Sequence, residues 1–499
     1  MNSKKIAIVS ALALAAVFAV MIFGGRTTQA AASTWYVSPT GAPSGTSGGS
    51  CASPSFNTIS LAIAAASNGD TIQVCVGTYN EQVQINKTLT LNGANAGTDA
   101  RTRVATAESI ITHPCGPVQI IADKVVLDGF TIQGSTLNPT TNPGCFGAGI
   151  WSNPGEFASD VGGHQILNNI VQNNISGVEL DSHCDFPTLV QFNLIQNNND
   201  PGAGQGNGIQ DNFGLCNATI DRNKFVGNSS SGALLFGPPV NSNGSNITVS
   251  NNEFSSNGSA IALLGVTSSA ISGNNSHNSV GTFGDIDIFG GVNGLSVTCN
   301  NLASGAGRGI QVEDPFAVGP NSNVTINTNN ISGYPVGLEE DLGGYTPATP
   351  NSLDATNNWW GSPTGPTIAS NPGGTGEPIV DMDGVVNYGS FLTSPSICAP
   401  CPNSNPGCTT TKKDCHKFVE QQEKDFNDGQ KADKKTFDDQ QKDAKKAFDA
   451  THPTAAQRKA FDEGQKNDKK NFDDGQKAAK DAFQVQHKAN ERQCNQLPN

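Results

Sequence analysis

The clearest pattern in the sequence is a short alternation of apolar and polar residues that recurs every 23 to 30 residues between residues 168 and 360. One phrase reads NNIVQNN from Asn168 and NNEFSSN from Asn251, and a second phrase such as GVELD from Gly177 or GIQVE from Gly309 follows it. Alternation with a period of two is typical of β-strands, and the Gly and Asn residues between the phrases favour turns. Such short strands bury a core only by stacking, so the repeats predict a solenoid.

An asparagine occupies the same place in each copy of the first phrase. In a parallel coil, equivalent side chains stack and can hydrogen-bond from one coil to the next. We therefore expect a ladder, whose members are Asn169, Asn193, Asn223, Asn252, Asn275, Asn301, Asn330 and Asn358 in the alignment of the phrases. Several N-x-S/T triplets, such as those at Asn86 and Asn246, leave glycosylation of the asparagines as an alternative.

These phrases resemble the right-handed parallel β-helix proteins of the pectin-lyase-like superfamily, over roughly Trp35 to Phe391. The resemblance implies a right-handed parallel β-helix solenoid at residues 33–397. An amphipathic segment from Thr58 to Ala66 predicts an N-terminal capping helix, which would cover strand edges that otherwise invite aggregation. The superfamily includes lyases, hydrolases, esterases, phage tail parts and non-catalytic surface proteins, so the fold alone does not select an activity.

An acidic cluster is expected on the last coils when the second phrases are aligned. One outward column then reads Glu179, Gln210, Leu234, Ala262, Asp287, Gln311 and Glu339. The next column reads Asp181, Asn212, Phe236, Leu264, Phe289, Glu313 and Asp341. Neighbouring carboxylates raise each other's pKa and can then act as acid and base. The candidate catalytic residues are Asp287, Glu313, Glu339 and Asp341, with Arg308 beside them.

Other interpretations of the acidic cluster stay open. Asp285, Asp287, Glu313 and Asp314 offer the hard oxygen ligands that suit Ca²⁺, although no cofactor is required. A solvated acidic face is the plainer alternative. The family motifs are incomplete: GDIDIFG at residues 284–290 resembles the pectin esterase strand but is one residue short. Pectate lyases pair Ca²⁺-binding acids with a basic residue, and here Arg308 is the one basic residue near the cluster.

Two tryptophans close the repeats within NNWWGSPTGPT, at Trp359 and Trp360. They could form a platform on which a sugar stacks. Large aromatic side chains serve mainly in burial, so a cap over the C-terminal end of the core is the favoured interpretation.

Twelve cysteines and the N-terminal segment point to an exported protein. Residues 1–32 have a basic start and an apolar run typical of a secretory signal peptide, with an uncleaved anchor as the alternative. Disulfides between neighbouring coils are expected for Cys51–Cys75, Cys115–Cys145 and Cys184–Cys216, whereas Cys299, Cys398, Cys401 and Cys408 are left unassigned. The expected location is extracellular or on the cell surface.

The body of the chain is strongly acidic. Residues 34–411 hold 7 Lys and Arg against 26 Asp and Glu, a net charge of −19. Such a surface repels nucleic acids and polyanionic glycans. It suits neutral or cationic partners, or bound divalent metal, and no membrane contact is expected beyond the N-terminal segment.

The C-terminal segment has a different pattern. After a Cys- and Pro-rich linker at residues 398–414, Phe recurs at positions 426, 437, 448, 461, 472 and 483, mostly every eleven residues, which is three helical turns. Pro453 interrupts this pattern, and the Phe positions mirror each other about that break, as do Cys415 and Cys494. This predicts an antiparallel α-helical hairpin over residues 415–494, closed by a Cys415–Cys494 disulfide. A single long helix, an oligomeric coiled coil and a disordered charged tail are the alternatives.

The sequence therefore favours a mainly β exported protein that recognises polysaccharide or a cell-surface glycan without catalysis. The hairpin would act as a spacer or as a docking arm for a protein partner. A polysaccharide lyase or glycoside hydrolase that uses the acidic cluster is the first alternative. A structural or adhesive envelope protein is the second.

Overall fold

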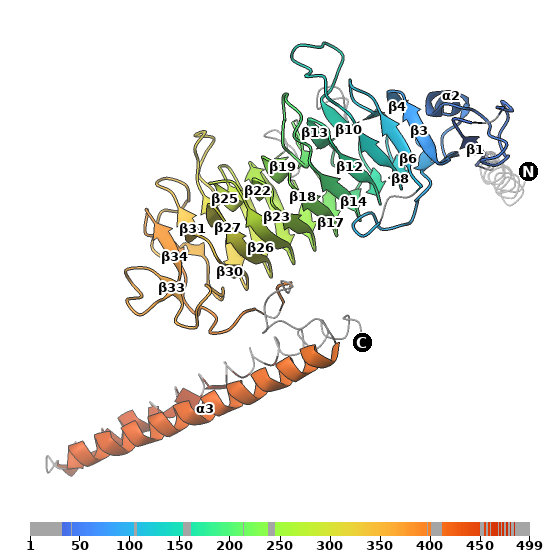
Figure 1. Cartoon of the computed structure of the whole chain (residues 1–499). Helices are drawn as coiled ribbons and strands as arrows, with labels where there is room; N and C mark the ends of the chain where they lie inside the picture. The colour runs from blue at the N-terminus through green and yellow to red at the C-terminus, as the bar shows by residue number, and fades with distance from the viewer. Residues whose placement is uncertain are drawn as a thin grey trace, which may run out of the picture.

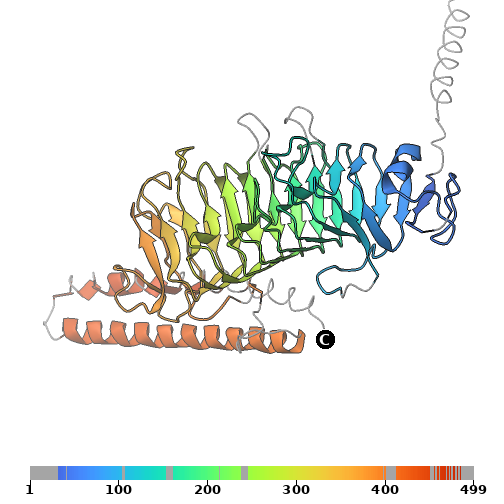
Figure 2. The same ribbon diagram turned by 45° about the horizontal axis from the view of Figure 1, so that its top comes forward.

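The computed structural model describes residues 32–396 except 41, 104–106, 153–160, 213 and 238–244, then residues 398–400, 412–449 and separate positions between 454 and 484. Its described strands form three sheets of 13, 12 and 10 strands. Each strand pairs in parallel with strands of the neighbouring coils, so the chain is a parallel β-helix (Figures 1 and 2).

The three sheets run the length of the stack. The first sheet contains β1 (Thr34–Val37), β2 (Thr71–Val74), β5 (Thr90–Asn92), β8 (Val126–Asp128), β11 (Gln165–Leu167), β14 (Thr188–Gln191), β17 (Ala218–Asp221), β20 (Thr248–Ser250), β23 (Thr267–Ser272), β26 (Asn293–Thr298), β29 (Thr325–Asn327), β32 (Leu353–Asp354) and β35 (Val386–Asn387). The second sheet contains β4 (Val83–Ile85), β7 (Val118–Ile120), β10 (Ala148–Ser152), β13 (Ser176–Leu180), β16 (Ile209–Gln210), β19 (Ser231–Phe236), β22 (Ser259–Leu264), β25 (Gly284–Ile288), β28 (Arg308–Val312), β31 (Val336–Glu340), β34 (Gly376–Asp381) and β33 (Pro366–Thr367). The third sheet contains β3 (Gly77–Asn80), β6 (Ser109–Thr112), β9 (Thr131–Gln133), β12 (Ile170–Gln172), β15 (Leu194–Gln196), β18 (Lys224–Val226), β21 (Glu253–Ser255), β24 (Asn275–Ser279), β27 (Asn301–Gly305) and β30 (Asn330–Ser332).

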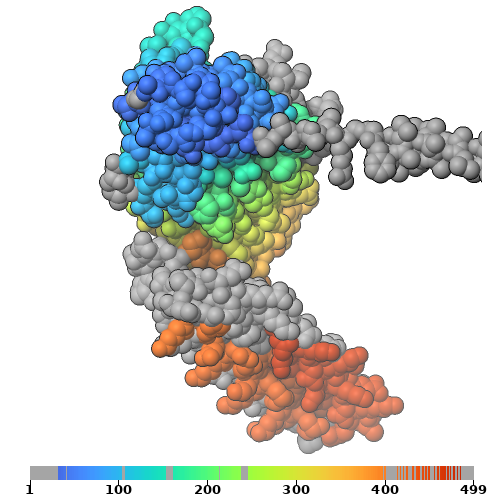
Figure 3. All heavy atoms as spheres, turned by 90° about the vertical axis from the view of Figure 1, so that its right-hand side faces the viewer, coloured from blue at the N-terminus to red at the C-terminus, as the bar shows by residue number. Residues whose placement is uncertain are grey.

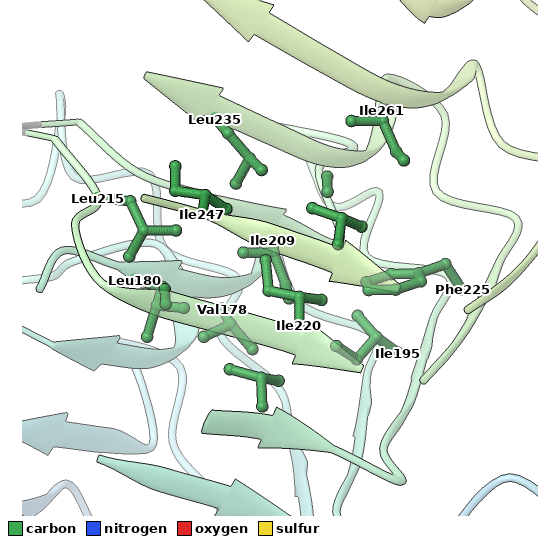
Figure 4. Close-up of a cluster of buried hydrophobic side chains, with 14 of the residues drawn as sticks. Val178, Leu180, Ile195, Ile209, Leu215, Ile220, Phe225, Leu235, Ile247 and Ile261 are labelled. Carbon is green, nitrogen blue, oxygen red and sulfur yellow. The ribbon is translucent and has the colours of Figure 1, made fainter. Parts of the chain in front are cut away.

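The core is built from apolar side chains that stack from coil to coil. In the first sheet, Ile166, Val190 and Ile220 pair in register, and the same column continues through Val249, Ile271, Val297 and Ile326. All of these side chains are buried. Figure 4 shows how residues from the three sheets, such as Ile220, Phe225 and Ile209, meet in the interior. Alternation along each strand therefore sends one set of side chains inward and leaves the other set on the outer faces.

A ladder of buried asparagines runs beside this core. The side-chain nitrogen of each donates to Oδ1 of the next, at 2.9–3.3 Å, through Asn169, Asn193, Asn223, Asn252, Asn274, Asn300, Asn329 and Asn358. Backbone N–H groups donate to the same oxygens at 2.8–3.0 Å. The expected stacking is confirmed, but in three coils the ladder uses the residue one place earlier than the phrase alignment gave: Asn274, Asn300 and Asn329 in place of Asn275, Asn301 and Asn330.

The residue before each ladder asparagine has a left-handed backbone. Asn168 and Asn251 have φ of 52° and 54°, and Phe192 and Arg222 adopt 58° and 52°. Asparagine tolerates this conformation better than most residues, which accounts for the frequent Asn-Asn pairs in the sequence. In the pairs Asn168–Asn169 and Asn251–Asn252, the first Asn therefore makes the turn and the second builds the ladder.

The N-terminal end of the stack carries helix α2 (Ile59–Ala65). Thr58 is its N-cap, and its hydroxyl oxygen accepts a hydrogen bond from the backbone N–H of Leu61 at 3.3 Å. Ile59 and Ile63 are buried and join the core. In Figure 3, which faces this side of the molecule, the first described residues (dark blue) lie over the end of the stack.

Disulfides link neighbouring coils. Cys51–Cys75, Cys115–Cys145 and Cys184–Cys216 form as expected. Cys299, which the sequence left unassigned, pairs with Cys398 and ties the chain after the last coil to the body. Cys401, Cys408 and the pair Cys415–Cys494 lie outside the residues whose side chains the structure describes.

Helix α3 (Lys412–Asp449) follows the stack. Described residues between 455 and 484 are also helical. The ring of Phe448 stacks on that of Phe461 with centroids 4.1 Å apart, and Phe437 stacks on Phe472 at 4.3 Å. Neither α2 nor α3 has the length and apolar character that a membrane-spanning helix needs, within the described part of the chain. The signal peptide or anchor expected at residues 1–32 falls almost wholly outside that part.

Candidate functional site

The outer face of the second sheet carries the residues that the repeats align. Glu179 pairs with Gln210, and the same column continues through Leu234, Ala262, Asp287, Gln311 and Glu339. This register agrees with the alignment of the second phrases. Adjacent strands in a sheet lie about 4.8 Å apart, so Asp287, Gln311 and Glu339 stand one above another on successive coils.

A groove with a volume of about 1000 Å³ follows this face over β19, β22 and β25. Its floor is mostly apolar and includes Leu234, Ala262 and Leu264. Phe283 and Phe316 line it from connecting segments, and they are 63% and 66% exposed. Asp287 and Glu313 also line the groove. A concave apolar site with a few polar groups that converge on it is the usual form of a ligand site in proteins.

Asp287 lies deep in this groove and is 7% exposed. Its Oδ1 accepts no hydrogen bond from any described residue. Burial raises the pKa of Asp287 to about 8, with a further contribution from the negative charges of Glu313 and Asp341. At neutral pH the carboxyl group is therefore mostly protonated.

Gln311 holds the two neighbouring acids together. Its side-chain nitrogen donates to Oε2 of Glu313 at 3.1 Å and to Oδ2 of Asp341 at 3.0 Å. Burial, followed by the charge of Asp341, raises the pKa of Glu313 to about 7. The amide thus fixes two carboxyl groups close to Asp287, and the negative charges of these acids oppose one another's ionisation.

Glu339 and Arg308 form a separate ion pair at the side of the cluster. Nε and Nη2 of Arg308 donate to the two carboxylate oxygens of Glu339, at 2.6 and 3.0 Å. These bonds hold the pKa of Glu339 below its usual range. The third nitrogen, Nη1, donates to the carbonyl oxygen of Thr282 at 2.6 Å. Arg308 is therefore engaged with Glu339 and the backbone.

The arrangement offers two kinds of carboxyl group within a few coils. Asp287 and Glu313 can donate a proton or a hydrogen bond at neutral pH, whereas Glu339 stays ionised. Pairs of acids whose surroundings separate their pKa values in this way can bind polar ligands. Enzymes that use acid–base catalysis commonly contain such pairs. The five catalytic candidates, Asp287, Glu313, Glu339, Asp341 and Arg308, thus lie on one face.

Asp285, a candidate metal ligand, is directed into the coil instead. It is 1% exposed and accepts hydrogen bonds from Tyr334 Oη at 2.7 Å and from the backbone N–H of Ala260 at 3.0 Å. The register aligns it with Gly309, a position where an added Cβ would meet Ile331 and the backbone of Gly337. Side chains at this column therefore enter the interior, and the simple alternation that placed Asp285 outside is wrong.

Asp314, the fourth candidate metal ligand, is used in a turn. Its two oxygens accept hydrogen bonds from the backbone N–H groups of Val318 and Gly319, at 2.9 and 3.0 Å. Among the described residues, no three His, Cys, Asp or Glu side chains are grouped so that they could hold a metal ion. The set Asp285, Asp287, Glu313 and Asp314 does not fit Ca²⁺, which takes six to eight oxygen ligands from converging groups.

Trp360 is fully buried and belongs to the core, whereas Trp359 is half-buried. The backbone of Trp359 pairs with Asn330 through a parallel bridge that continues the third sheet. Trp360 packs near Gly337, where an added Cβ would lie 3.2 Å from its ring. The position of Trp360 is the one expected of a cap over the last coils. Its buried ring is not available to a sugar.

Two features of this face were not found from the sequence. Phe283 and Phe316 come from segments between the phrases, which do not align from one repeat to the next. A second group of buried acids lies on earlier coils, where burial raises the pKa of Glu179 to about 8 and also raises that of Asp211. The aligned columns contain Glu179 and Asp181, so the same alignment could have indicated this second group of acids.

Comparisons with known proteins give likenesses of fold alone. The structure is similar to that of pectate lyase Pel9A, with 15% identity, a TM-score of 0.39, and coverage of 75% of this chain and 90% of that one. It is also similar to a rhamnogalacturonan lyase, with 12% identity, a TM-score of 0.40, and coverage of 72% of this chain and 96% of that one. For PfbA, a surface adhesin of Streptococcus pneumoniae, the identity is 11% and the TM-score 0.29, with coverage of 55% of this chain and 75% of that one. At these TM-scores, no functional conclusion rests on the likenesses. No family model and no curated protein matches the sequence.

Proposed function

We propose that the protein is exported and binds a polysaccharide that carries no negative charge, in the groove over β19, β22 and β25, without cleaving it. The observation that carries this proposal is the exposure of Phe283 and Phe316 beside a floor that ends in the carboxyl groups of Asp287 and Glu313. Aromatic rings pack against the apolar faces of sugar rings, and the polar groups accept or donate hydrogen bonds to hydroxyls. Repeated coils extend the face in one direction, as an extended glycan requires.

The charge of the body supports the restriction to uncharged or cationic glycans. Residues 34–411 carry a net charge of −19, and Asp287 and Glu313 lie at one end of the groove. Polyuronates would meet repulsion over the whole surface. The four disulfides among the described residues suit an oxidising, extracellular location, which we include in the proposal.

A binding experiment tests the proposal. Neutral oligosaccharides and polyuronates of matched length are titrated into the full chain by calorimetry. Phe283→Ala and Phe316→Ala should each weaken binding of the neutral ligand roughly tenfold, since about 1.4 kcal/mol corresponds to a factor of ten. Leu61→Ala is the matched control, because Leu61 is 51% exposed on α2, away from the groove. Binding of polyuronates alone, or unchanged affinity in both Phe variants, would contradict the proposal.

Hydrolysis of a glycan is the second candidate function. Two observations favour it: the pKa values of Asp287 and Glu313 are raised to about 8 and 7, and Glu339 remains ionised nearby. A protonated acid beside a carboxylate is the pair that glycoside hydrolases use. Release of reducing sugar that disappears in both Asp287→Asn and Glu313→Gln would establish this function and overturn the non-catalytic proposal. Release that persists in both variants would place the chemistry elsewhere.

We propose further that residues 415–494 form an antiparallel helical hairpin, after a signal peptide at 1–32, a β-helix at 33–397 and a linker at 398–414. The stacked pairs Phe448–Phe461 and Phe437–Phe472 support this. So do an ion pair between Lys445 and Asp462 at 3.5 Å and a hydrogen bond from Gln465 Nε2 to the carbonyl oxygen of Gln441 at 2.9 Å.

The hairpin would serve as a spacer or as a docking arm for a protein partner. Its net charge of +1 over residues 416–494, from 17 Lys and Arg against 16 Asp and Glu, contrasts with the acidic body. Removal of residues 412–499 should leave glycan binding by the groove unchanged within about twofold, which separates the two roles. Loss of groove binding on this truncation would contradict the assignment of separate roles.

A further inference from the structure

The carboxyl group of Asp287 faces the groove with an unsatisfied oxygen. Asp287 is 7% exposed, lines the groove, and its Oδ1 receives no hydrogen bond from the described residues. A buried oxygen without a donor is costly, so a molecule that enters the groove gains affinity if it brings a donor to this point.

The nitrogen donors near Asp287 are already used, and the side chain with which Asp287 shares a hydrogen bond, Glu313, is another acid. The side-chain nitrogens of Arg308 donate hydrogen bonds to the carboxylate of Glu339 and to the carbonyl oxygen of Thr282. Gln311 donates to Glu313 and to Asp341. The end of the groove therefore holds several acids and no described basic group directed at Asp287.

The neighbouring strands bring one basic residue and several acids to this end of the groove. On β22, the residue opposite Asp287 is Ala262. On the other side, β28 and the segment after it bring Arg308, Gln311 and Glu313, while β31 and its end bring Glu339 and Asp341. Asp314 is held in its own turn. Acids thus outnumber bases around the unsatisfied oxygen.

We propose that this end of the groove receives the protonated amine of an amino sugar, with Asp287 as its principal acceptor. The inference rests on the proposed function and names the class of glycan within it. An ammonium group brings several N–H donors and a positive charge, whereas a hydroxyl brings one donor and no charge. The apolar floor and the two exposed Phe rings remain available to the sugar ring that carries the amine.

The consequence is a coupling between ligand binding and proton release. In the empty groove, burial and mutual repulsion keep Asp287 and Glu313 largely protonated at pH 6, since their pKa values are raised to about 8 and 7. A bound ammonium favours their charged forms, so protons leave as the ligand binds. A neutral sugar of the same length has no such effect.

The experiment compares three tetrasaccharides on the full chain at pH 6: β-1,4-linked glucosamine, β-1,4-linked N-acetylglucosamine and β-1,4-linked glucose. We expect the glucosamine tetramer to bind at least about tenfold more tightly than the other two, as an added charge-assisted hydrogen bond allows. Its apparent binding enthalpy should vary with the ionisation enthalpy of the buffer. Asp287→Asn should remove both effects, so that the variant no longer prefers the glucosamine tetramer to the other two.

Asp185→Asn is the control for net charge, because Asp185 has a side chain that is 74% exposed and lies outside the groove lining. It should keep the preference for the amine. If the three tetramers bind wild type equally, or if Asp287→Asn keeps the preference, the inference is overturned while glycan binding stands. If none of the three binds, the inference and the proposed function both fail. Amine binding that Asp185→Asn and Asp287→Asn weaken equally would show general charge attraction and would also overturn the inference.

Discussion

The side-chain nitrogen of Asn223 donates a hydrogen bond to Oδ1 of Asn252 in the next coil, 3.1 Å away. Oδ1 of Asn223 in turn accepts from the side chain and from the backbone N–H of Asn193, at 2.9 and 3.0 Å. Asn223 is fully buried. Each ladder asparagine therefore satisfies backbone groups of two coils, and its loss leaves buried polar groups without partners.

Asn223→Ala should lower the free energy of unfolding by about 2–4 kcal/mol, because it orphans the N–H of Asn193 and the carbonyl oxygen of Val190, which now accepts from Asn223 at 2.8 Å. Chemical unfolding followed by circular dichroism measures the difference. Asn57→Ala is the control, since Asn57 is exposed and lies outside the ladder. Equal effects of the two substitutions would mean that the ladder adds nothing specific.

Stability should fall as pH rises from about 5 to 8.5. The pKa values of Glu179 and Asp287 are raised to about 8, and those of Glu313 and Glu340 to about 7. In the unfolded chain such groups titrate near pH 4. The folded protein thus binds more protons between these limits, and the linkage relation makes its free energy of unfolding decrease as pH rises through the folded-state values.

Asp287→Asn isolates one member of this group. The difference in the free energy of unfolding between the variant and wild type should grow in favour of the variant by about 1–3 kcal/mol from pH 5 to pH 8.5, since a pKa difference of one corresponds to about 1.4 kcal/mol and the acids are mutually coupled. Thermal unfolding at the two pH values provides the measurement. A constant offset between the two proteins across the range would show that Asp287 does not titrate as described.

Much of the fold follows from the sequence because the apolar residues recur with a period of two within each phrase. A shift of one residue would turn the whole inward column outward, so the register that pairs Ile220 with Val249 is strongly specified. The same register set the outward column that contains Asp287 and Glu339. Cys184 and Cys216 were paired for the same reason, because they occupy neighbouring coils.

The sequence-based predictions failed where the chain leaves this register. Asp285 has the same parity as Asp287, yet it shares a column with Gly309, and its carboxyl group lies in the interior, where Tyr334 Oη donates to it. Cys398 lies 99 residues from Cys299, after the last repeat, where no phrase fixes its position. Phe283 lies in a connecting segment, and such segments differ in length between coils, so the groove walls were not predictable from alignment.

His164 predicts a second effect of pH, of opposite sign. The side chain is fully buried, and neither ring nitrogen has a hydrogen-bond partner among the described residues. Burial lowers the pKa of His164 to about 4, whereas an unfolded histidine titrates near 6.5. The unfolded chain binds more protons between these values, so this group makes stability decrease as pH falls from about 6.5 to 4.

His164→Leu should remove this acid sensitivity. Relative to its own value at pH 7, the variant should retain about 2–3 kcal/mol more stability than wild type at pH 4.2, measured by urea unfolding. His277→Gln serves as the control, because that ring is 31% exposed. If wild type and His164→Leu lose stability in parallel on acidification, His164 must be protonated or solvated in the folded protein, contrary to its burial.

The stacked rings of the C-terminal segment allow a direct test of its register. Phe437 and Phe472 have parallel rings with centroids 4.3 Å apart. Phe461 stacks on Phe448 instead, so it belongs to a different layer from Phe437. A double-mutant cycle with Phe437→Ala and Phe472→Ala should give a coupling energy of about 0.5–1.5 kcal/mol, the range for aromatic pairs in contact. The cycle with Phe437→Ala and Phe461→Ala should be additive within about 0.5 kcal/mol, since these residues belong to different layers. Unfolding of the helical signal in the full chain provides the four stabilities of each cycle. Coupling in the second cycle as large as in the first would indicate a different pairing of the arms, and additivity in both would indicate that the two segments do not pack as a hairpin.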